Sequence, residues 1–133
     1  MIEIRQATTE TDFQQVGHYF HAFRDWLTQT YSEIIHLAEP FFIELEAEIE
    51  SLPGSYAPPR GCLLIASYNG TPAGTVGLAA LDGNYCEMRR LFVDPQFRGA
   101  KIGRALAEAI IREAQERGYT RMRLGTLPRH YAA

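Results

Sequence analysis

The segment that decides the fold is a strand, a glycine-bearing turn and the start of a helix, Arg89-Arg90-Leu91-Phe92-Val93-Asp94-Pro95-Gln96-Phe97-Arg98-Gly99-Ala100-Lys101-Ile102-Gly103-Arg104-Ala105-Leu106. Its first five residues are typical of a strand, and apolar residues recur at helical spacing from about Ile102 onward. The backbone N–H groups of the turn and the positive end of the helix dipole therefore converge on one place. This arrangement indicates a site for a phosphate or pyrophosphate group at the helix N-terminus.

Glycines and basic residues in the turn support this anion site. Gly99 and Gly103 let the backbone approach a bulky anion closely, and Arg98, Lys101 and Arg104 add positive charge. The alternative is a strand-to-helix turn that binds no ligand, because glycine and basic residues are common in such turns. Other phosphate motifs fit poorly. The segment lacks the Gly-Lys-Ser/Thr of a P-loop, and its two glycines do not form the G-x-G-x-x-G dinucleotide fingerprint.

The periodicity of the rest of the chain predicts a sheet with helices. Residues 2–4 alternate as a strand, a helix capped by Thr9 or Thr11 runs to about residue 31, and a second helix begins near Pro40. Turn signals at residues 69–70 and 82–83 separate three further strands, which predicts an antiparallel meander. The next strand should lie parallel, because a helix connects it to the meander. The expected ranges are 62–68, 72–81 and 85–93 for the meander, 102–117 for the helix and 120–125 for the last strand.

This order of elements resembles that of the GNAT acetyltransferases. Their acetyl-CoA motif is Arg/Gln-x-x-Gly-x-Gly/Ala after a strand that ends in Val-x-Pro, and the residues matching it here are Val93-Asp94-Pro95, Arg98, Ile102 and Gly103. Lys101 stands where the family most often has its central glycine, so its side chain must point away from the pyrophosphate. The resemblance covers nearly the whole chain. It implies a single α/β (α+β) domain, residues 1–133, with a mixed sheet in the order β-α-α-β-β-β-α-β, whose fourth and fifth strands are parallel and splayed apart.

The resemblance also implies acetyl-CoA as the co-substrate and indicates which residues hold it. The backbone groups of Leu91, Phe92 and Val93 are expected to bind the pantetheine arm, because splayed strands leave the fourth strand with unpaired N–H and C=O groups. The pyrophosphate is expected on the turn that follows. The residues of that turn are Arg98, Gly99, Ala100, Lys101, Ile102, Gly103 and Arg104.

The implied reaction moves an acetyl group from acetyl-CoA to a primary amine of a small molecule, amino acid or peptide. An alkylamine has a pKa of about 10, so it must give up a proton to a base before it reacts. Glu87 is the candidate base, because similar enzymes often carry a glutamate in this region. Alternation along the strand places Glu87 on the same face as Arg89 and Leu91. Two other roles for Glu87 stay open: an ion pair with Arg89 or Arg90, and an anchor for the substrate amine.

The acceptor cannot be identified from the sequence. The fold implied by the resemblance would place it between the first two helices, the loop after residue 52 and the fourth strand. The aromatic and acidic residues of that region suit a cationic or amine-bearing molecule, or they serve only to pack the fold. They are Trp26, Tyr31, Tyr56 and Glu33.

The family continues after its fifth strand with a further helix and two strands, whereas this chain ends at Ala133. An incomplete domain is therefore expected, and Tyr131 is not assigned the role of the family's general acid. The alternative function is a truncated, non-catalytic module that binds CoA or only associates with itself. An unpaired edge at residues 120–125 predicts a homodimer that covers this edge and the crossover helix.

Composition limits the other functions. The net charge of −3 argues against a general attraction to nucleic acid, and the excess of positive charge is confined to the part of the chain from Arg89 onward. No apolar run approaches the roughly 20 residues of a membrane span, and the N-terminus lacks the layout of a signal peptide, so no membrane partner and a cytoplasmic location are expected. Cys62 and Cys86 are predicted to be buried, and His18 and His21 lack further ligands, so no metal site is predicted.

Overall fold

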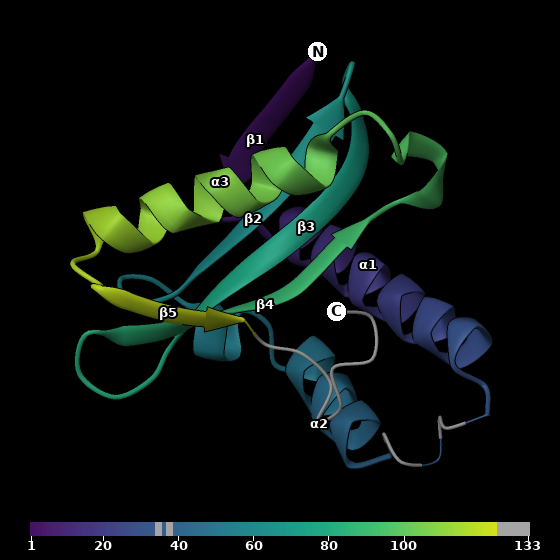
Figure 1. The fold of residues 1–133 in the computed structure, drawn as a ribbon, viewed down its shortest axis with the longest axis horizontal. Helices are drawn as coiled ribbons and strands as arrows, with labels where there is room; N and C mark the ends of the chain where they lie inside the picture. The colour runs from purple at the N-terminus through teal and green to yellow at the C-terminus, as the bar shows by residue number, and fades with distance from the viewer. Residues whose placement is uncertain (34–35, 37–38, 125–133) are drawn as a thin grey trace.

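The computed structural model describes residues 1–33, 36 and 39–124, which form one five-stranded sheet with helices on both faces (Figure 1). The strands lie in the order β1-β2-β3-β4-β5, and the predicted fold class is confirmed. Gly125, the predicted end of the last strand, lies outside the described residues, and so does Tyr131. The elements are β1 (Ile2–Gln6), α1 (Glu10–Thr30), α2 (Glu39–Glu50), η2 (Gly54–Tyr56), β2 (Cys62–Tyr68), β3 (Thr71–Ala80), β4 (Tyr85–Val93), η3 (Pro95–Phe97), α3 (Ile102–Glu116) and β5 (Arg121–Leu124).

Strand pairing follows the predicted topology. β1 through β4 are joined antiparallel, each to the next, and β5 runs parallel to β4 after the α3 crossover. The β4–β5 ladder covers only the first four residues of β4, from Tyr85 to Met88. Within the part of the chain that the structure describes, the rest of β4 therefore has no partner on its β5 side.

Each face of the sheet carries its own core because strand side chains alternate between the two faces. α3 covers one face and α1 and α2 cover the other (Figure 1). In β2, Leu64 and Ala66 face α3, whereas Leu63 and Ile65 face the first two helices. Because both faces are buried, the central strands are held rigidly. One of them, β4, carries the candidate site. Cys62 and Cys86 are buried, as predicted.

The start of α1 is fixed by a capping box. Thr9 accepts a hydrogen bond from the Asp12 N–H (3.1 Å), and Asp12 accepts one in return from the Thr9 N–H (3.2 Å). Asp12 also accepts hydrogen bonds from Arg5 (2.7 Å) and the Thr8 N–H (2.9 Å). These bonds, the one from Arg5 foremost, hold the pKa of the Asp12 carboxyl well below its usual range. Of the two threonines that could cap α1, Thr9 and Thr11, Thr9 is therefore the cap.

No helix in the described ranges has both the length and the apolar character needed to cross a membrane. The same residues hold no group of three or more His, Cys, Asp or Glu side chains arranged to bind a metal ion.

Candidate acyl-CoA site

A β-bulge in β4 shapes the centre of the candidate site. Thr75 of β3 stands opposite Phe92 and Gly77 stands opposite Arg89, so a single β3 residue faces both Arg90 and Leu91. Arg90 has a positive φ of 57°, which is uncommon for a residue with a side chain. The extra residue shifts the alternation of side chains from this point to the end of the strand.

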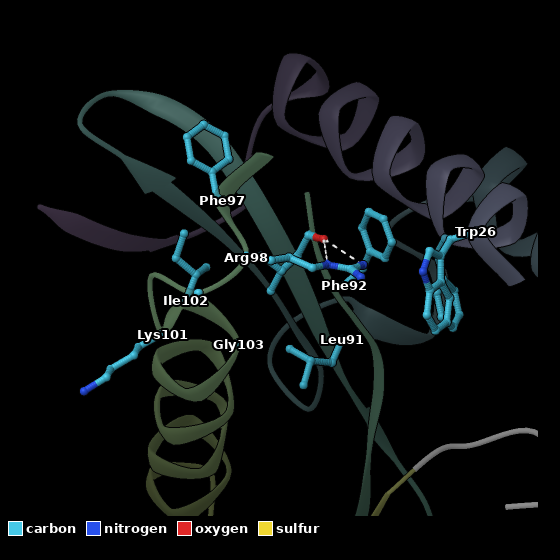
Figure 2. Close-up of a pocket in the computed structure, with 11 residues that line it drawn as sticks. Trp26, Leu91, Phe92, Phe97, Arg98, Lys101, Ile102 and Gly103 are labelled. Carbon is cyan, nitrogen blue, oxygen red and sulfur yellow. Dashed lines mark hydrogen bonds between the residues drawn. The ribbon is translucent and has the colours of Figure 1, made fainter. Parts of the chain in front are cut away.

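The bulge corrects one prediction from the sequence. Arg90 and Phe92 both point toward the first two helices, where Arg90 contacts Phe41 and Phe92 contacts Phe23. Leu91 lies between them and is directed toward α3 (Figure 2). The prediction that Leu91 shares the face of Glu87 and Arg89 is therefore wrong, because simple alternation does not anticipate a bulge.

The turn after β4 ends in a helix N-terminus without a side-chain cap. Gly99 and Lys101 have positive φ angles of 92° and 66°, and Lys101, at the N-cap position, makes no side-chain capping bond. The first hydrogen bond of α3 runs from the Ala105 N–H to the Lys101 carbonyl (3.1 Å). The N–H groups of residues 102–104 therefore point out of the helix end without an intrahelical acceptor. Such an end attracts an anion through its donors and its dipole.

There is room for an anion against this helix end. A Cβ added to Gly99 would meet no atom within 4 Å, and one added to Gly103 would meet only the Val93 side chain, at 3.5 Å. Lys101 points outward from the helix, as its place in the motif requires (Figure 2). The chain therefore offers what a pyrophosphate needs, which is a cluster of open N–H donors beside glycines.

The basic side chains of the turn are placed differently from one another. The guanidinium of Arg98 donates to the Val93 carbonyl from Nε (3.3 Å) and Nη2 (3.2 Å) and lies over the rings of Trp26 and Phe92. Arg104 is exposed and pairs with Glu108 one helical turn further on (3.2 Å). Arg98 therefore stabilises the wall of the site, whereas Arg104 points to solvent and is bound to Glu108.

A pocket of about 510 Å³ joins the turn to the end of β4 (Figure 2). It brings together the predicted residues Leu91–Val93 with Arg98, Gly99, Lys101, Ile102 and Gly103, whereas Ala100 and Arg104 do not line it. The opposite wall comes from α1, through Phe23 and Trp26. The sequence placed Trp26 in the acceptor region and gave Phe23 no role in this site. Only the packing of α1 beside β4 reveals that both residues line this pocket.

Glu87 lies at the seam between β4 and β5 and is paired with two arginines. One carboxylate oxygen accepts from Nε of Arg89, and the other accepts from Nε of Arg123 at 2.7 Å. Burial raises the pKa of Glu87, but the two arginines outweigh burial, so the pKa lies below its usual value. A lowered pKa makes a weak base. The geometry therefore favours the ion-pair role that the sequence left open, and the role of general base stays a prediction.

A second buried ion pair stands beside the first and was not predicted. Arg90 donates to both oxygens of Glu48 on α2, from Nε (3.2 Å) and Nη2 (2.6 Å). The hydroxyl of Tyr56 also donates to Glu48 (2.7 Å), and burial raises the pKa of this hydroxyl. Tyr56 is 1% exposed, so it packs the fold and does not line an acceptor site. The bulge alone turns Arg90 toward Glu48, and the sequence carries no signal for it.

Comparison with known proteins settles the family. The sequence profile described as "Acetyltransferase (GNAT) family" matches residues 20–133. The chain belongs to this family. A relative from Schizosaccharomyces pombe, an uncharacterized N-acetyltransferase, is 38% identical to this GNAT chain over 88 residues, which cover 65% of the chain and 54% of the relative. The match to the other first relatives covers still less of their length, so the chain spans about half or less of the curated relatives it matches.

Solved structures agree on the GNAT fold. The PaiA N-acetyltransferase of Thermoplasma acidophilum in complex with coenzyme A superposes with a TM-score of 0.72 at 20% identity, covering 99% of this chain and 83% of that one. A GNAT acetyltransferase of Staphylococcus aureus gives a TM-score of 0.68 at 23% identity, covering 95% and 73%. At these identities the likeness concerns the fold.

Proposed function

We propose that this GNAT chain binds acetyl-CoA and transfers its acetyl group to a primary amine. The observation that carries the proposal is the open, uncapped N-terminus of α3 beside the second half of β4, which has no partner on its β5 side among the described residues. Family membership and the name N-acetyltransferase, given to both a curated relative and a solved neighbour, support the same reaction.

In this proposal the chain binds the co-substrate at two places, the N-terminus of α3 and the backbone at the end of β4. The N–H groups of residues 102–104 hold the pyrophosphate at the helix end. The backbone groups of Leu91, Phe92 and Val93 pair with the amides of the pantetheine arm, in the manner of an added strand. Acetyl-CoA supplies a thioester carbonyl, which a neutral amine attacks. A backbone N–H at the bulge then stabilises the negative charge that develops on the carbonyl oxygen.

The alternative is a module that binds CoA without turnover. Two measurements on the same protein separate the alternatives: calorimetry with CoA, and release of free thiol from acetyl-CoA across a panel of amines. The proposal expects binding together with amine-dependent thiol release. Binding without thiol release from any amine would favour the non-catalytic module, and absence of CoA binding would contradict both.

We also propose that two copies associate through the β5 edge. In the described chain, β5 is the outer strand of the sheet, and Leu124 (62% exposed) and Ile111 (42% exposed) lie beside a groove of about 360 Å³ between α3 and β5. An unpaired strand edge with apolar neighbours is a template for pairing. Light scattering at micromolar concentration should give the mass of a dimer, and Leu124→Lys should shift it to the monomer. A monomeric parent protein would refute the dimer.

A further inference from the structure

Two arginines share one carboxylate at the seam of β4 and β5. Glu87 and Arg123 are direct partners in the parallel ladder, and Arg89 lies two residues further along β4 on the same face. The pKa of Glu87 is lowered, chiefly by hydrogen bonds from the two arginines against burial, and hydrogen bonding to Glu87 raises the pKa of Arg123. All three groups are therefore charged at neutral pH. The cluster has one positive charge in excess.

The excess charge is presented to solvent by Arg123. Its side chain is 57% exposed, whereas that of Glu87 is 9% exposed. Both arginines reach Glu87 through Nε, and the Nη groups of Arg123 have no acceptor among the residues that the structure describes. Arg123 therefore keeps a planar fork of donors open, and a fork of this kind matches the two oxygens of a carboxylate.

The carboxylates near the cluster are already engaged. Glu48 accepts two hydrogen bonds from Arg90 and one from Tyr56, so it offers little to a substrate ammonium group. Both carboxylate oxygens of Glu87 accept hydrogen bonds from arginines. Arg121 shares the face of Arg123 and lies over the ring of Tyr85 at 5.1 Å, which adds another positive charge. This face of the seam therefore favours an anion and disfavours a purely cationic acceptor.

In the proposed function, the end of the pantetheine arm lies at Leu91, close to the cluster along β4. Arg89 is two residues before Leu91, a distance of about 7 Å along a strand. Arg89 stands opposite Gly77, whose Cα faces the Tyr56 ring in the core under α1 and α2, so it lies on that side of β4, away from the α3 turn where the phosphates are expected. A small molecule can therefore place one group on the arginines while its amine reaches the end of the pantetheine arm.

We infer that the acceptor of the acyl transfer carries a carboxylate as well as its amine, as an amino acid does, and that the open fork of Arg123, with Arg89 behind it, binds this carboxylate. The inference rests on the proposed function. It narrows the acceptor from amines in general to anionic amines. Glu87 is in this account a positioning residue, since it orients the two guanidinium groups and does not itself contact the acceptor.

The first test compares matched acceptors. A panel of amino acids with different spacings between amine and carboxylate is assayed by thiol release from acetyl-CoA, each beside its carboxamide and its decarboxylated amine. A charge-assisted pair should raise kcat/KM for the acid at least about tenfold over the neutral forms. Arg123→Gln should remove this preference by raising the KM of the acid, and it should leave the KM of acetyl-CoA unchanged. The matched control, Arg112→Gln on the exposed face of α3, should keep the preference. Equal kcat/KM for acids and carboxamides would overturn the inference.

A second test does not depend on turnover. Calorimetry on the protein saturated with CoA compares an N-acetyl amino acid, which is the expected product, with its carboxamide. The acid should bind at least about tenfold more tightly, and Arg123→Gln should abolish the difference. Equal affinities would overturn the inference even if the amines are acetylated. Tighter binding of the acid without any acetylation would uphold the anionic subsite and contradict the proposed enzymatic function, so the two failures are distinguishable.

Discussion

Gly103→Asp should weaken CoA binding by about two orders of magnitude while leaving the fold intact. Gly103 is the second residue of α3, and a Cβ built there meets only the Val93 side chain at 3.5 Å, an ordinary contact. Glycine inside a helix costs up to about 1 kcal/mol relative to alanine. A carboxylate in the first turn adds about 0.3–1 kcal/mol of favourable interaction with the helix dipole. The free energy of unfolding should therefore stay equal or rise.

The loss of CoA affinity follows from charge repulsion. A carboxylate at this position would stand about 5 Å from a phosphate held by the helix end, and at an effective dielectric constant of about 20–40 the repulsion is about 2–3 kcal/mol per phosphate charge. This corresponds to a dissociation constant about 30- to 150-fold higher. The same side chain also competes for the N–H groups that the phosphate needs.

Calorimetry with CoA, combined with thermal unfolding, tests this prediction. Gly103→Asn is the matched control, because it adds a side chain of the same shape without the charge. The asparagine variant should bind CoA much closer to the parent protein than the aspartate variant does. Equal affinity of the aspartate and asparagine variants would refute the charge argument, and parent-like affinity of both would show that the phosphates are not held at this turn.

Three further predictions concern other parts of the chain. Glu87→Gln should take the charged partner from Arg89 and from the exposed Arg123, so it should lower the free energy of unfolding by about 1–3 kcal/mol, mostly through the more buried Arg89. It should also raise the acceptor KM and leave CoA affinity unchanged. A kcat lower by about two to four orders of magnitude at constant KM would instead identify Glu87 as the base. Thr9→Ala should lower the free energy of unfolding by about 1 kcal/mol in denaturant titrations, because α1 loses its cap, and an unchanged midpoint would contradict the capping role. Asp12 has a lowered pKa in the fold, so its stabilisation is complete above its ordinary pKa of about 4 and is lost as the pH falls toward the folded value. Asp12→Asn should therefore flatten the fall in melting temperature between about pH 5 and pH 2, and a slope equal to that of the parent would count against this account.

The order and type of the elements could be predicted because local signals agree with the fold. The turn signals at residues 69–70 and 82–83 separate β2, β3 and β4 as expected, and the helical period from Ile102 begins α3 at that residue. The sequence leaves two possible starts for α1, because Thr9 and Thr11 are both good caps. Only the reciprocal bond with Asp12 selects Thr9.

The candidate site was predictable only where sequence neighbours form it. The turn from Arg98 to Gly103 is continuous, so its pattern can be read directly. Contacts between distant segments left no such signal: Arg123 reaches Glu87 across the β4–β5 ladder, and Trp26 reaches the pocket from α1. The bulge at Arg90 changes the predicted side-chain orientations most, because one additional residue in β4 alters which of its side chains face α3.

The central claim is transfer of an acetyl group to an amine, and following that group tests it most directly. The protein is incubated with acetyl-CoA carrying an isotope label in its acetyl group and with the panel of amines, and the products are separated by mass spectrometry. The account predicts labelled N-acetyl amine, formed only when protein and amine are both present and strongly reduced for Gly103→Asp. Label that stays in acetyl-CoA, or that appears only as free acetate across the whole panel, would contradict the account.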